Sequence, residues 1–324
     1  MKRFVLGIAG IFCILLGIVG WLLPILPGWL FIFVGLSLLA PEATARLRRR
    51  IWRRLYKKAV IPLDEWGSLP VLSGFTTKHF SVSISKTDDL SDPGRQKSLI
   101  DAFSADETAR SIQALRSGHV VFMNQVHQDH VAVIGKTDLA DGGGFCRLAL
   151  TDGVITDLPN VTLLALTADC LSVFLYAGPA EGDRERARPW IGLVHAGWRG
   201  TKKGITRKAF GLLSERSGCR AENIKVALGP SIGARAYEVG REFGEFFPDA
   251  IGKTLKSKGG RFLFDLAGEN RRQLISAGAD PRNISDHGIC TFSEKEHFYS
   301  YRREGDKAGR MISFIVLRKA GVSS

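Results

Sequence analysis

The chain has 324 residues and a formal net charge of +13, of which residues 1–60 hold +9 through ten Lys or Arg and one Glu, leaving +4 for the rest. Five cysteines are present, an odd number, and no two of them form a Cys-x-x-Cys pair. They are Cys13, Cys146, Cys170, Cys219 and Cys290. This pattern excludes a disulfide framework and indicates a reducing compartment.

The N-terminal part contains a long apolar run. Residues 4–40 include no charged side chain over 37 positions, whereas one membrane-spanning helix needs about 20 apolar residues. Pro24, Pro27 and Gly28 interrupt the run near its middle, which favours a reversal of the chain there. We therefore expect a transmembrane helical hairpin over residues 1–42, with a re-entrant hairpin as the alternative.

A strongly basic segment follows the hairpin at residues 43–62. Eight Lys or Arg lie between Arg46 and Lys58, and apolar residues recur every fourth position within the segment. This pattern predicts a basic amphipathic helix lying on anionic lipid headgroups, and no nucleic-acid partner is expected. Because basic residues flank the hairpin on both sides, we expect both of its ends, and the rest of the chain, on the cytoplasmic side of the inner membrane.

Residues 63–324 have the composition and length of one large globular domain. Apolar runs predict strands at 120–122, 131–134, 161–166, 172–176, 191–194, 224–228 and 311–317. Helical patterns lie near 97–103, 107–115, 201–215, 240–247 and 266–277, and an exposed hairpin loop is expected at 178–189. Strands and helices mix without strict alternation, which indicates an α/β or α+β fold with a mixed sheet.

Three strand ends carry residues that can hold a metal. His127 stands in Gln-Val-His, Cys170 in Ala-Asp-Cys and His195 in His-Ala-Gly-Trp. Two imidazoles and one thiolate would leave a fourth position of zinc open for water or substrate, which is a catalytic arrangement. The spacing is not a local metal motif, however, so a buried cysteine with two hydrogen-bonded histidines is the alternative.

Several longer segments carry a family resemblance. NQVHQDHV, TADC, GLVHAGWRGT, ALGPSIGARAYEVG, FDLAGENRRQL and CTFSEKEHFYSYRREGDKAGRMISFI occur in this order. Over about residues 74–317 the chain resembles the polyphenol-oxidase or laccase-domain family, whose members are regarded as purine nucleoside phosphorylases with adenosine deaminase activity. The first forty residues resemble small two-span membrane proteins with a Pro-Gly-Pro-Gly-Trp motif.

The resemblance implies a layered α-β-β-α sandwich with one zinc ion held by His127, Cys170 and His195. It implies phosphorolysis of adenosine, inosine and methylthioadenosine, with deamination of adenosine as a second activity. Arg199 beside the last ligand is our candidate for binding phosphate. Asp169 is a candidate proton carrier or a partner that orients a ligand histidine.

Two further basic residues, Lys78 and Arg310, are candidates for binding phosphate or substrate. Arg310 matches the family pattern near the C terminus. Lys78 stands where relatives usually have Arg, and lysine cannot form a bidentate clamp on phosphate. The segment 79–96 also departs from the family pattern. These differences leave phosphate binding as the part of the prediction with least support from the sequence.

Other functions compete with this one. Multi-copper oxidation is disfavoured because only seven histidines are present and none forms a His-x-His pair, although copper could occupy the zinc site adventitiously. A hydrolase that edits peptidoglycan precursors would use Cys170 as a nucleophile activated by His127 or His195. A third alternative is a degenerate, non-enzymatic membrane-bound module. The preferred nucleoside and the oligomeric state do not follow from the sequence.

Overall fold

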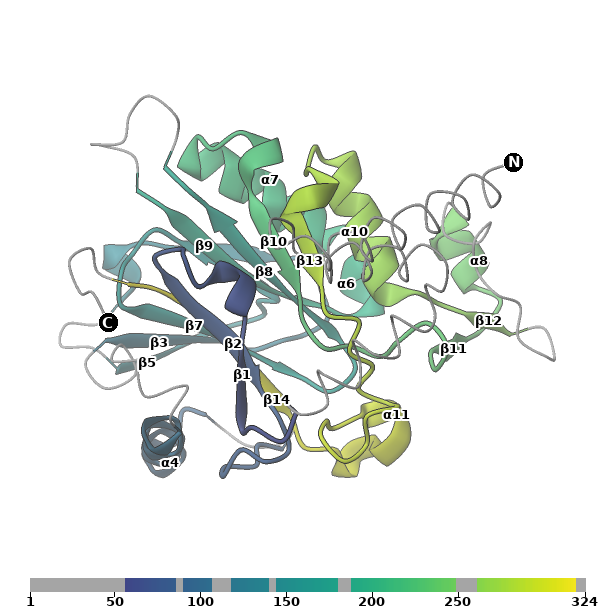
Figure 1. Cartoon of the computed structure of the whole chain (residues 1–324), viewed down its shortest axis with the longest axis horizontal. Coiled ribbons are helices and arrows are strands. Elements are labelled where there is room, and N and C mark those ends of the chain that lie inside the picture. Colours follow the sequence, from purple (N-terminus) through teal and green to yellow (C-terminus); the bar gives the residue numbers. More distant parts are fainter. Residues whose placement is uncertain are drawn as a thin grey trace, which may run out of the picture. The chain divides into compact units, whose positions relative to one another are not determined.

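The computed structural model describes residues 56–85, 90–106, 118–139, 144–179, 188–248 and 261–318. These residues form a mixed α/β fold built on two mixed sheets (Figure 1). The predicted hairpin lies outside the described residues, as do residues 43–55 of the predicted basic helix and the helix predicted at 107–115. The end of the predicted basic helix is wrong, because residues 60–62 form a strand that pairs antiparallel with residues 74–76. Within the described ranges, the helices are too short or too polar to cross a membrane.

The first sheet has six strands in the order β1, β2, β14, β7, β3 and β5. Their bounds are Val60–Pro62, Val71–Thr76, Met311–Leu317, Val161–Thr167, His119–Met123 and Gly144–Leu148. The C-terminal strand β14 is inserted antiparallel between β2 and β7, while β3 runs parallel to both β7 and β5. This sheet therefore joins residues from both ends of the domain.

The second sheet also has six strands, in the order β13, β10, β8, β9, β6 and β4. Their bounds are Ile284–Asp286, Lys225–Leu228, Leu171–Ala177, Trp190–Ala196, Gly153–Thr156 and Val131–Ile134. The hairpin β8–β9 is antiparallel, and its register pairs Ser172 with His195. Every residue of β8 is buried, which explains its continuous apolar sequence.

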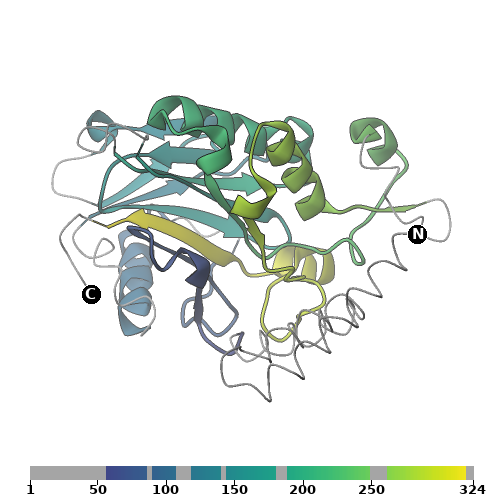
Figure 2. The same cartoon turned by 45° about the horizontal axis from the view of Figure 1, so that its top comes forward.

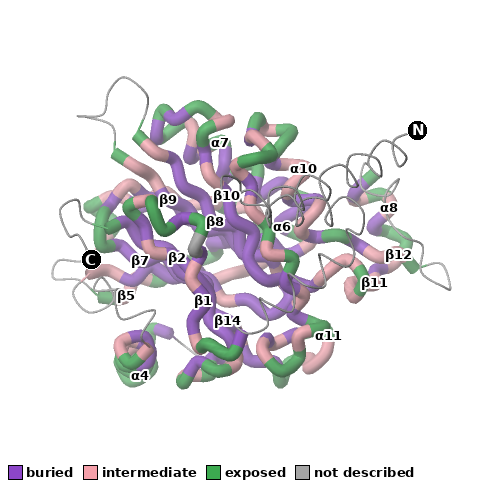
Figure 3. Tube along the Cα trace, viewed as in Figure 1, coloured by how far each residue is buried: buried purple, intermediate pink, exposed green. Residues whose placement is uncertain are grey.

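The two sheets lie face to face, and a helix covers the outer face of each (Figure 2). On the second sheet, α7 (Ile205–Ser217) buries Phe210 and Leu213 in a core with Val226 of β10. On the first sheet, α4 (Pro93–Ala105) packs Phe103 edge-on against Phe314 of β14, with the two ring centroids 5.5 Å apart. Figure 3 shows the strands as the most continuously buried part of the trace. Burial of such large apolar side chains contributes about 1.5–3 kcal/mol each.

Shorter elements complete the fold. They are α6 (Trp198–Lys202), α8 (Phe243–Phe246), α10 (Leu266–Ser276), α11 (Tyr301–Glu304), β11 (Glu238–Val239) and β12 (Phe262–Leu263). Asn270 of α10 is fully buried and bridges α6 and α7, since its Nδ2 donates to Thr201 Oγ1 and its Oδ1 accepts from Thr206 Oγ1. This network fixes α6, which directly follows His195 in the chain.

All seven predicted strands are confirmed, but the described residues hold seven further strands that the sequence analysis does not predict: β1, β2, β5, β6, β11, β12 and β13. Two of the predicted helices also differ. The helix expected at 201–215 is two helices, because Gly204 adopts a left-handed φ of 76° between α6 and α7. The helix expected at 240–247 is confined to the four residues of α8. The strands on either side of the predicted loop at 178–189 pair as a hairpin, and residues 180–187 of that loop lie outside the described residues.

Candidate metal centre and pocket

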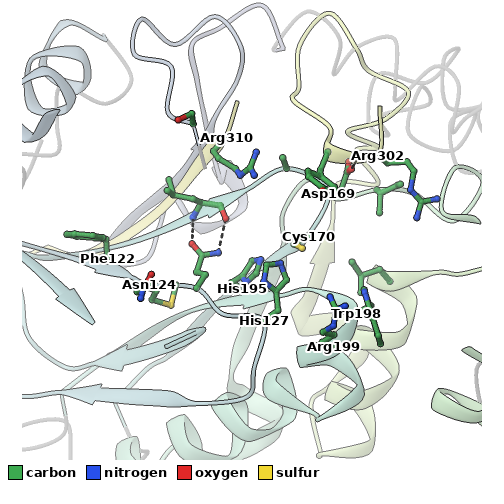
Figure 4. Close-up of a pocket in the computed structure, with 18 of the residues that line it drawn as sticks. Phe122, Asn124, His127, Asp169, Cys170, His195, Trp198, Arg199, Arg302 and Arg310 are labelled. Atoms are coloured by element: carbon green, nitrogen blue, oxygen red, sulfur yellow. Dashed lines mark hydrogen bonds between the residues drawn. The ribbon is translucent and has the colours of Figure 1, made fainter. Parts of the chain in front are cut away.

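The structure brings the three predicted metal ligands together. His127 follows β3, Cys170 lies in the turn between β7 and β8, and His195 lies in β9. One ligand atom from each residue lies within 4.8 Å of the ligand atoms of the other two. Figure 4 shows the three side chains converging from different elements. The long intervals in sequence are bridged by strand pairing within each sheet and by the packing of one sheet on the other.

Asp152, a residue that the sequence analysis missed, holds two of the ligands. Its carboxylate is fully buried and accepts a hydrogen bond from His195 Nδ1 at 2.8 Å. It also accepts the backbone N–H groups of Val126, His127 and Gln128 at 3.1, 3.0 and 2.9 Å. With Nδ1 bound in this way, His195 presents Nε2 toward the other ligands. A metal-binding histidine is commonly oriented by such a carboxylate.

One ligand and the neighbour of another have uncommon backbone conformations. His127 has a φ of 59° and Asp169, next to Cys170, has a φ of 90°. Non-glycine residues rarely adopt positive φ, and they do so where the surrounding contacts determine the conformation. At His127 those contacts are the hydrogen bonds of residues 126–128 to one carboxylate. Two of the four non-glycine residues with positive φ among the described residues therefore lie at the metal centre, and the other two are Leu150 and Asn160.

The charges of the three ligands are strongly coupled. Burial alone would raise the pKa of the Cys170 thiol, but the charge of His195 and the hydrogen bond to His127 outweigh it and lower that pKa to about 6. Burial likewise disfavours the His195 imidazolium, but the Cys170 thiolate and the hydrogen bond to Asp152 raise its pKa to about 9. Without metal, the pair is therefore a thiolate beside an imidazolium, and a cation is attracted to that thiolate.

Gly197 leaves room for the ligands. A Cβ atom at this position would lie 3.0 Å from Cys170 Sγ and 3.0 Å from His127 Cδ2. Both distances are shorter than ordinary contacts between these atoms. The glycine of the His-Ala-Gly-Trp segment is therefore required by the packing of the centre, although its own φ of −76° suits any residue.

The centre forms part of a pocket of about 520 Å³. A volume of this size is typical of small-molecule sites. Its lining includes Asn124, Asp169, Trp198, Arg199, Tyr237 and Arg310. Gln125 also lines the pocket and is fixed to β7 by two hydrogen bonds of 2.8 Å to the backbone of Leu166.

Asp169 lines the pocket but points its carboxylate at the C-terminal segment. Its oxygens accept hydrogen bonds from Thr291 Oγ1 at 2.6 Å, Ser300 Oγ at 3.0 Å and the Arg302 backbone N–H at 2.6 Å. The side chain is 9% exposed. The structure thus gives Asp169 a role in holding the wall of the pocket, which carries Tyr301 and Arg302.

Arg199 and Arg310 both line the pocket, as the phosphate assignment requires. The guanidinium of Arg199 lies 4.4 Å from the ring centroid of Trp198. Arg310 is partly buried, and its Nη1 donates to the carbonyl oxygens of Ala308 and Gly309 at 2.6 and 3.1 Å. Burial lowers the pKa of Arg310, and the negative charges of Cys170 and Asp169, which act to raise it, do not fully offset this effect. Within the described ranges, neither arginine forms an ion pair with a carboxylate.

Lys78 lies outside the pocket that Arg199 and Arg310 line. Its Nζ donates to Glu304 Oε1 at 2.7 Å and lies 5.0 Å from the ring centroid of Tyr299, and the residue is not part of the pocket lining. The lysine therefore joins the end of β2 to α11. The structure separates this residue from the other two basic residues of the phosphate assignment.

Comparisons with known proteins agree with this architecture. The family described as multi-copper polyphenol oxidoreductase laccase matches residues 73–318. The purine nucleoside phosphorylase YlmD of Bacillus subtilis is 32% identical over 270 residues, covering 77% of this chain and 90% of that protein. A purine nucleoside phosphorylase of Deinococcus radiodurans is 33% identical over 270 residues, covering 79% and 93%.

Solved structures show the same likeness. The crystal structure of the hypothetical protein YfiH from Bacillus licheniformis has a TM-score of 0.64 and 28% identity, covering 80% of this chain and 97% of that chain. The structure of YlmD from Geobacillus stearothermophilus has a TM-score of 0.61 and 27% identity, covering 78% and 93%. The chain therefore belongs to the multi-copper polyphenol oxidoreductase laccase family.

Proposed function

We propose that the chain is a zinc-dependent purine nucleoside phosphorylase that also deaminates adenosine, and that it works at the cytoplasmic face of the inner membrane. Relatives that align over more than three quarters of the chain are named purine nucleoside phosphorylase. The observation that supports the proposal most is the convergence on one pocket of the three metal ligands and of two arginines that form no ion pair with a carboxylate in the described part of the chain.

The donor set fits zinc. Two imidazole nitrogens and one thiolate are ligands of catalytic zinc sites, which keep one position open. The low pKa of Cys170 supplies the thiolate, and the contact with Asp152 directs Nε2 of His195 toward it. Bound zinc would supply the Lewis acidity that makes water nucleophilic near neutral pH, which is the chemistry that deamination needs. Copper would occupy the same donors only adventitiously.

Phosphate would be bound by Arg199 and Arg310. A guanidinium donates two parallel hydrogen bonds to a phosphate, and each such charged bond is stronger than a neutral one. Arg310 still has Nε and Nη2 available after its contacts to the two carbonyls. The packing of Arg199 on Trp198 fixes the direction of its side chain. The two cations would hold phosphate in position against the sugar, which replaces a costly bimolecular encounter.

Uncharged donors would stabilise the departing base. Burial, together with the charges of Cys170 and Asp169, raises the pKa of Tyr237 against the opposing effects of Arg302 and Arg199, so its hydroxyl remains a donor at neutral pH. Asn124 accepts from Arg147 Nη2 at 3.1 Å through its Oδ1, which leaves its Nδ2 hydrogens as donors. Such preformed donors stabilise negative charge that develops on a purine as its bond to the sugar breaks.

The membrane location rests on the sequence of residues 1–62. The apolar run and the basic segment after it are the features that support a hairpin anchor and a helix on anionic lipid. Carbonate extraction and protease accessibility of the full chain in inverted vesicles test this part. Recovery of the full chain in the carbonate-soluble fraction would reject the anchor and leave the catalytic proposal unaffected.

The central experiment uses the full chain in detergent. Bound zinc is measured together with adenine, inosine and ribose 1-phosphate formed from adenosine in the presence and absence of phosphate. Cys170→Ala removes one ligand, and Cys146→Ala is the matched control because Cys146 does not line the pocket. One zinc per chain and phosphate-dependent adenine release, lost only in Cys170→Ala, are expected. Zinc without turnover would contradict the phosphorylase and favour a non-enzymatic module.

A second candidate is a hydrolase that edits peptidoglycan precursors with Cys170 as nucleophile. The arrangement of Asp152, His195 and Cys170, with a thiol pKa of about 6, is the observation that favours it. In this case chelated protein would retain activity, and alkylation of Cys170 would abolish it in a one-to-one ratio. For the phosphorylase we expect chelation itself to abolish activity and zinc to protect the thiol.

A further inference from the structure

Two histidines from distant parts of the sequence meet at the surface outside the pocket. His79 Nε2 lies 3.0 Å from His297 Nδ1, and the ring centroids are 5.3 Å apart with an interplanar angle of 55°. His79 is exposed, His297 is partly buried, and neither lines the pocket. Ions in solution therefore have access to the pair.

The backbone holds these two residues in place. Lys78 N donates to His297 O at 2.8 Å, which joins the two segments directly. His79 N donates to Thr77 Oγ1 at 3.1 Å. Phe298, the neighbour of His297, is fully buried. The two rings are thus presented by fixed backbone, and little ordering is needed before both can bind one ion.

The separation of the nitrogens suits a shared metal ion. Two imidazole nitrogens at about 2.0–2.1 Å from one metal stand roughly 2.9–3.4 Å apart for angles between 90° and tetrahedral. Imidazole is a good ligand for copper(II), nickel(II) and zinc, and copper(II) binds most tightly in that series. We propose that His79 and His297 form a second, two-histidine binding site for a divalent transition metal, with copper(II) the preferred ion.

The site would join two segments that border the pocket wall. Lys78, beside His79, already pairs with Glu304 at 2.7 Å, and Tyr301 and Arg302 of the same C-terminal segment line the pocket. Within the described ranges, no third histidine, cysteine or carboxylate forms a three-ligand group with the pair. A metal bound here links the end of β2 to the segment before α11 and stabilises the folded state.

The probe is copper(II) held by iminodiacetate, which has too few open positions to satisfy the His127, Cys170 and His195 site. It is titrated into zinc-loaded, full-length protein in detergent and followed by calorimetry and electron paramagnetic resonance. The variants are His79→Gln and His297→Gln. His119→Gln is the control, because His119 is also a partly exposed histidine and lies in neither site.

One equivalent should bind, with a spectrum that reports two imidazole nitrogens and with a rise in the unfolding temperature. His79→Gln and His297→Gln should each weaken binding by about tenfold or more, because half of the protein donors are lost. The His119→Gln variant should bind as the unchanged protein does. Equal binding by all variants, or a spectrum with a single imidazole, would show that the pair is only a hydrogen bond between rings.

Discussion

The carboxylate of Asp152 accepts one hydrogen bond from His195 Nδ1 at 2.8 Å and another from the backbone N–H of His127 at 3.0 Å. One buried side chain thus sets the ring orientation of one ligand and the backbone conformation of another. We expect Asp152→Asn to reduce zinc affinity by about 10- to 100-fold, as loss of a carboxylate behind a metal-binding histidine does. Competition with a chromophoric chelator measures the affinity.

Asp157→Asn is the control for this change, because Asp157 follows β6 at the end opposite Asp152 and is only partly buried. Unfolding of the metal-free variants in denaturant separates loss of the fold from loss of the metal. If Asp152→Asn bound zinc as tightly as Asp157→Asn, the carboxylate would have no part in orienting the ligands.

The interaction between Cys170 and His195 predicts how the reactivity of this cysteine depends on pH. In metal-free protein, alkylation of Cys170 by iodoacetamide should increase through about pH 6 and then level off, because its thiolate is formed above that pKa. Cys146 is an internal control, since burial and the charge of Asp138 raise its pKa. Peptide mass spectrometry follows both sites at once. Zinc should suppress alkylation of Cys170 only.

Stability should respond to pH much less than this reactivity does. Folding lowers the pKa of Cys170 from 9.0 to about 6, so its stabilising effect is lost as pH falls from 9 toward 6. Folding raises the pKa of His195 from 6.5 to about 9, so its effect is lost as pH rises through that range. The two slopes oppose each other between pH 6.5 and 9, and the pair leaves the free energy of unfolding nearly constant there.

Phosphate binding is tested at the two arginines of the pocket. Arg310→Met removes the charge but keeps much of the side-chain volume, and we expect the KM for phosphate to rise about 10- to 100-fold, as for loss of a charged hydrogen bond. Arg199→Met should act in the same direction. Arg220→Met is the control, because Arg220 pairs with Glu222 on the surface. An unchanged KM for phosphate in both pocket variants would remove these residues from the site.

Asp169 distinguishes a structural role from a proton carrier. Asp169→Asn keeps the shape of the side chain but weakens its bonds to Thr291, Ser300 and Arg302. We expect a lower unfolding temperature and a higher KM, with the pH profile of kcat unchanged. A loss of kcat with an altered pH profile, and with KM and the unfolding temperature unaffected, would instead identify Asp169 as a proton carrier.

The sequence predicts the long buried strands from their apolar runs, and it predicts the metal ligands through the family resemblance of the short motifs that hold them. The shorter strands, such as β1 and β6, lack so clear an apolar run. Continuous apolar runs such as β8 read as buried strands, and the ligands stand in short motifs at strand ends. The sequence does not single out Asp152, because a lone Asp in Thr-Asp-Gly resembles a turn residue and its hydrogen-bond partners Val126 and His195 are distant in the sequence. The position of Lys78 in a motif predicts a phosphate ligand, whereas its contact with Glu304 depends on the packing of α11, which the sequence does not show.

The last prediction concerns the space beside the ligands. Gly197→Ala would place a methyl group 3.0 Å from Cys170 Sγ and from His127 Cδ2, so at least one ligand must move. We expect weaker zinc binding while the fold is retained, because the backbone at this position already suits alanine. Gly211→Ala is the matched control. Nothing lies within 4 Å of a Cβ there, and an alanine inside α7 should stabilise the helix by about 0.5–1 kcal/mol. Zinc affinity in Gly197→Ala equal to that in Gly211→Ala would mean that the ligands are not held as tightly as this packing implies.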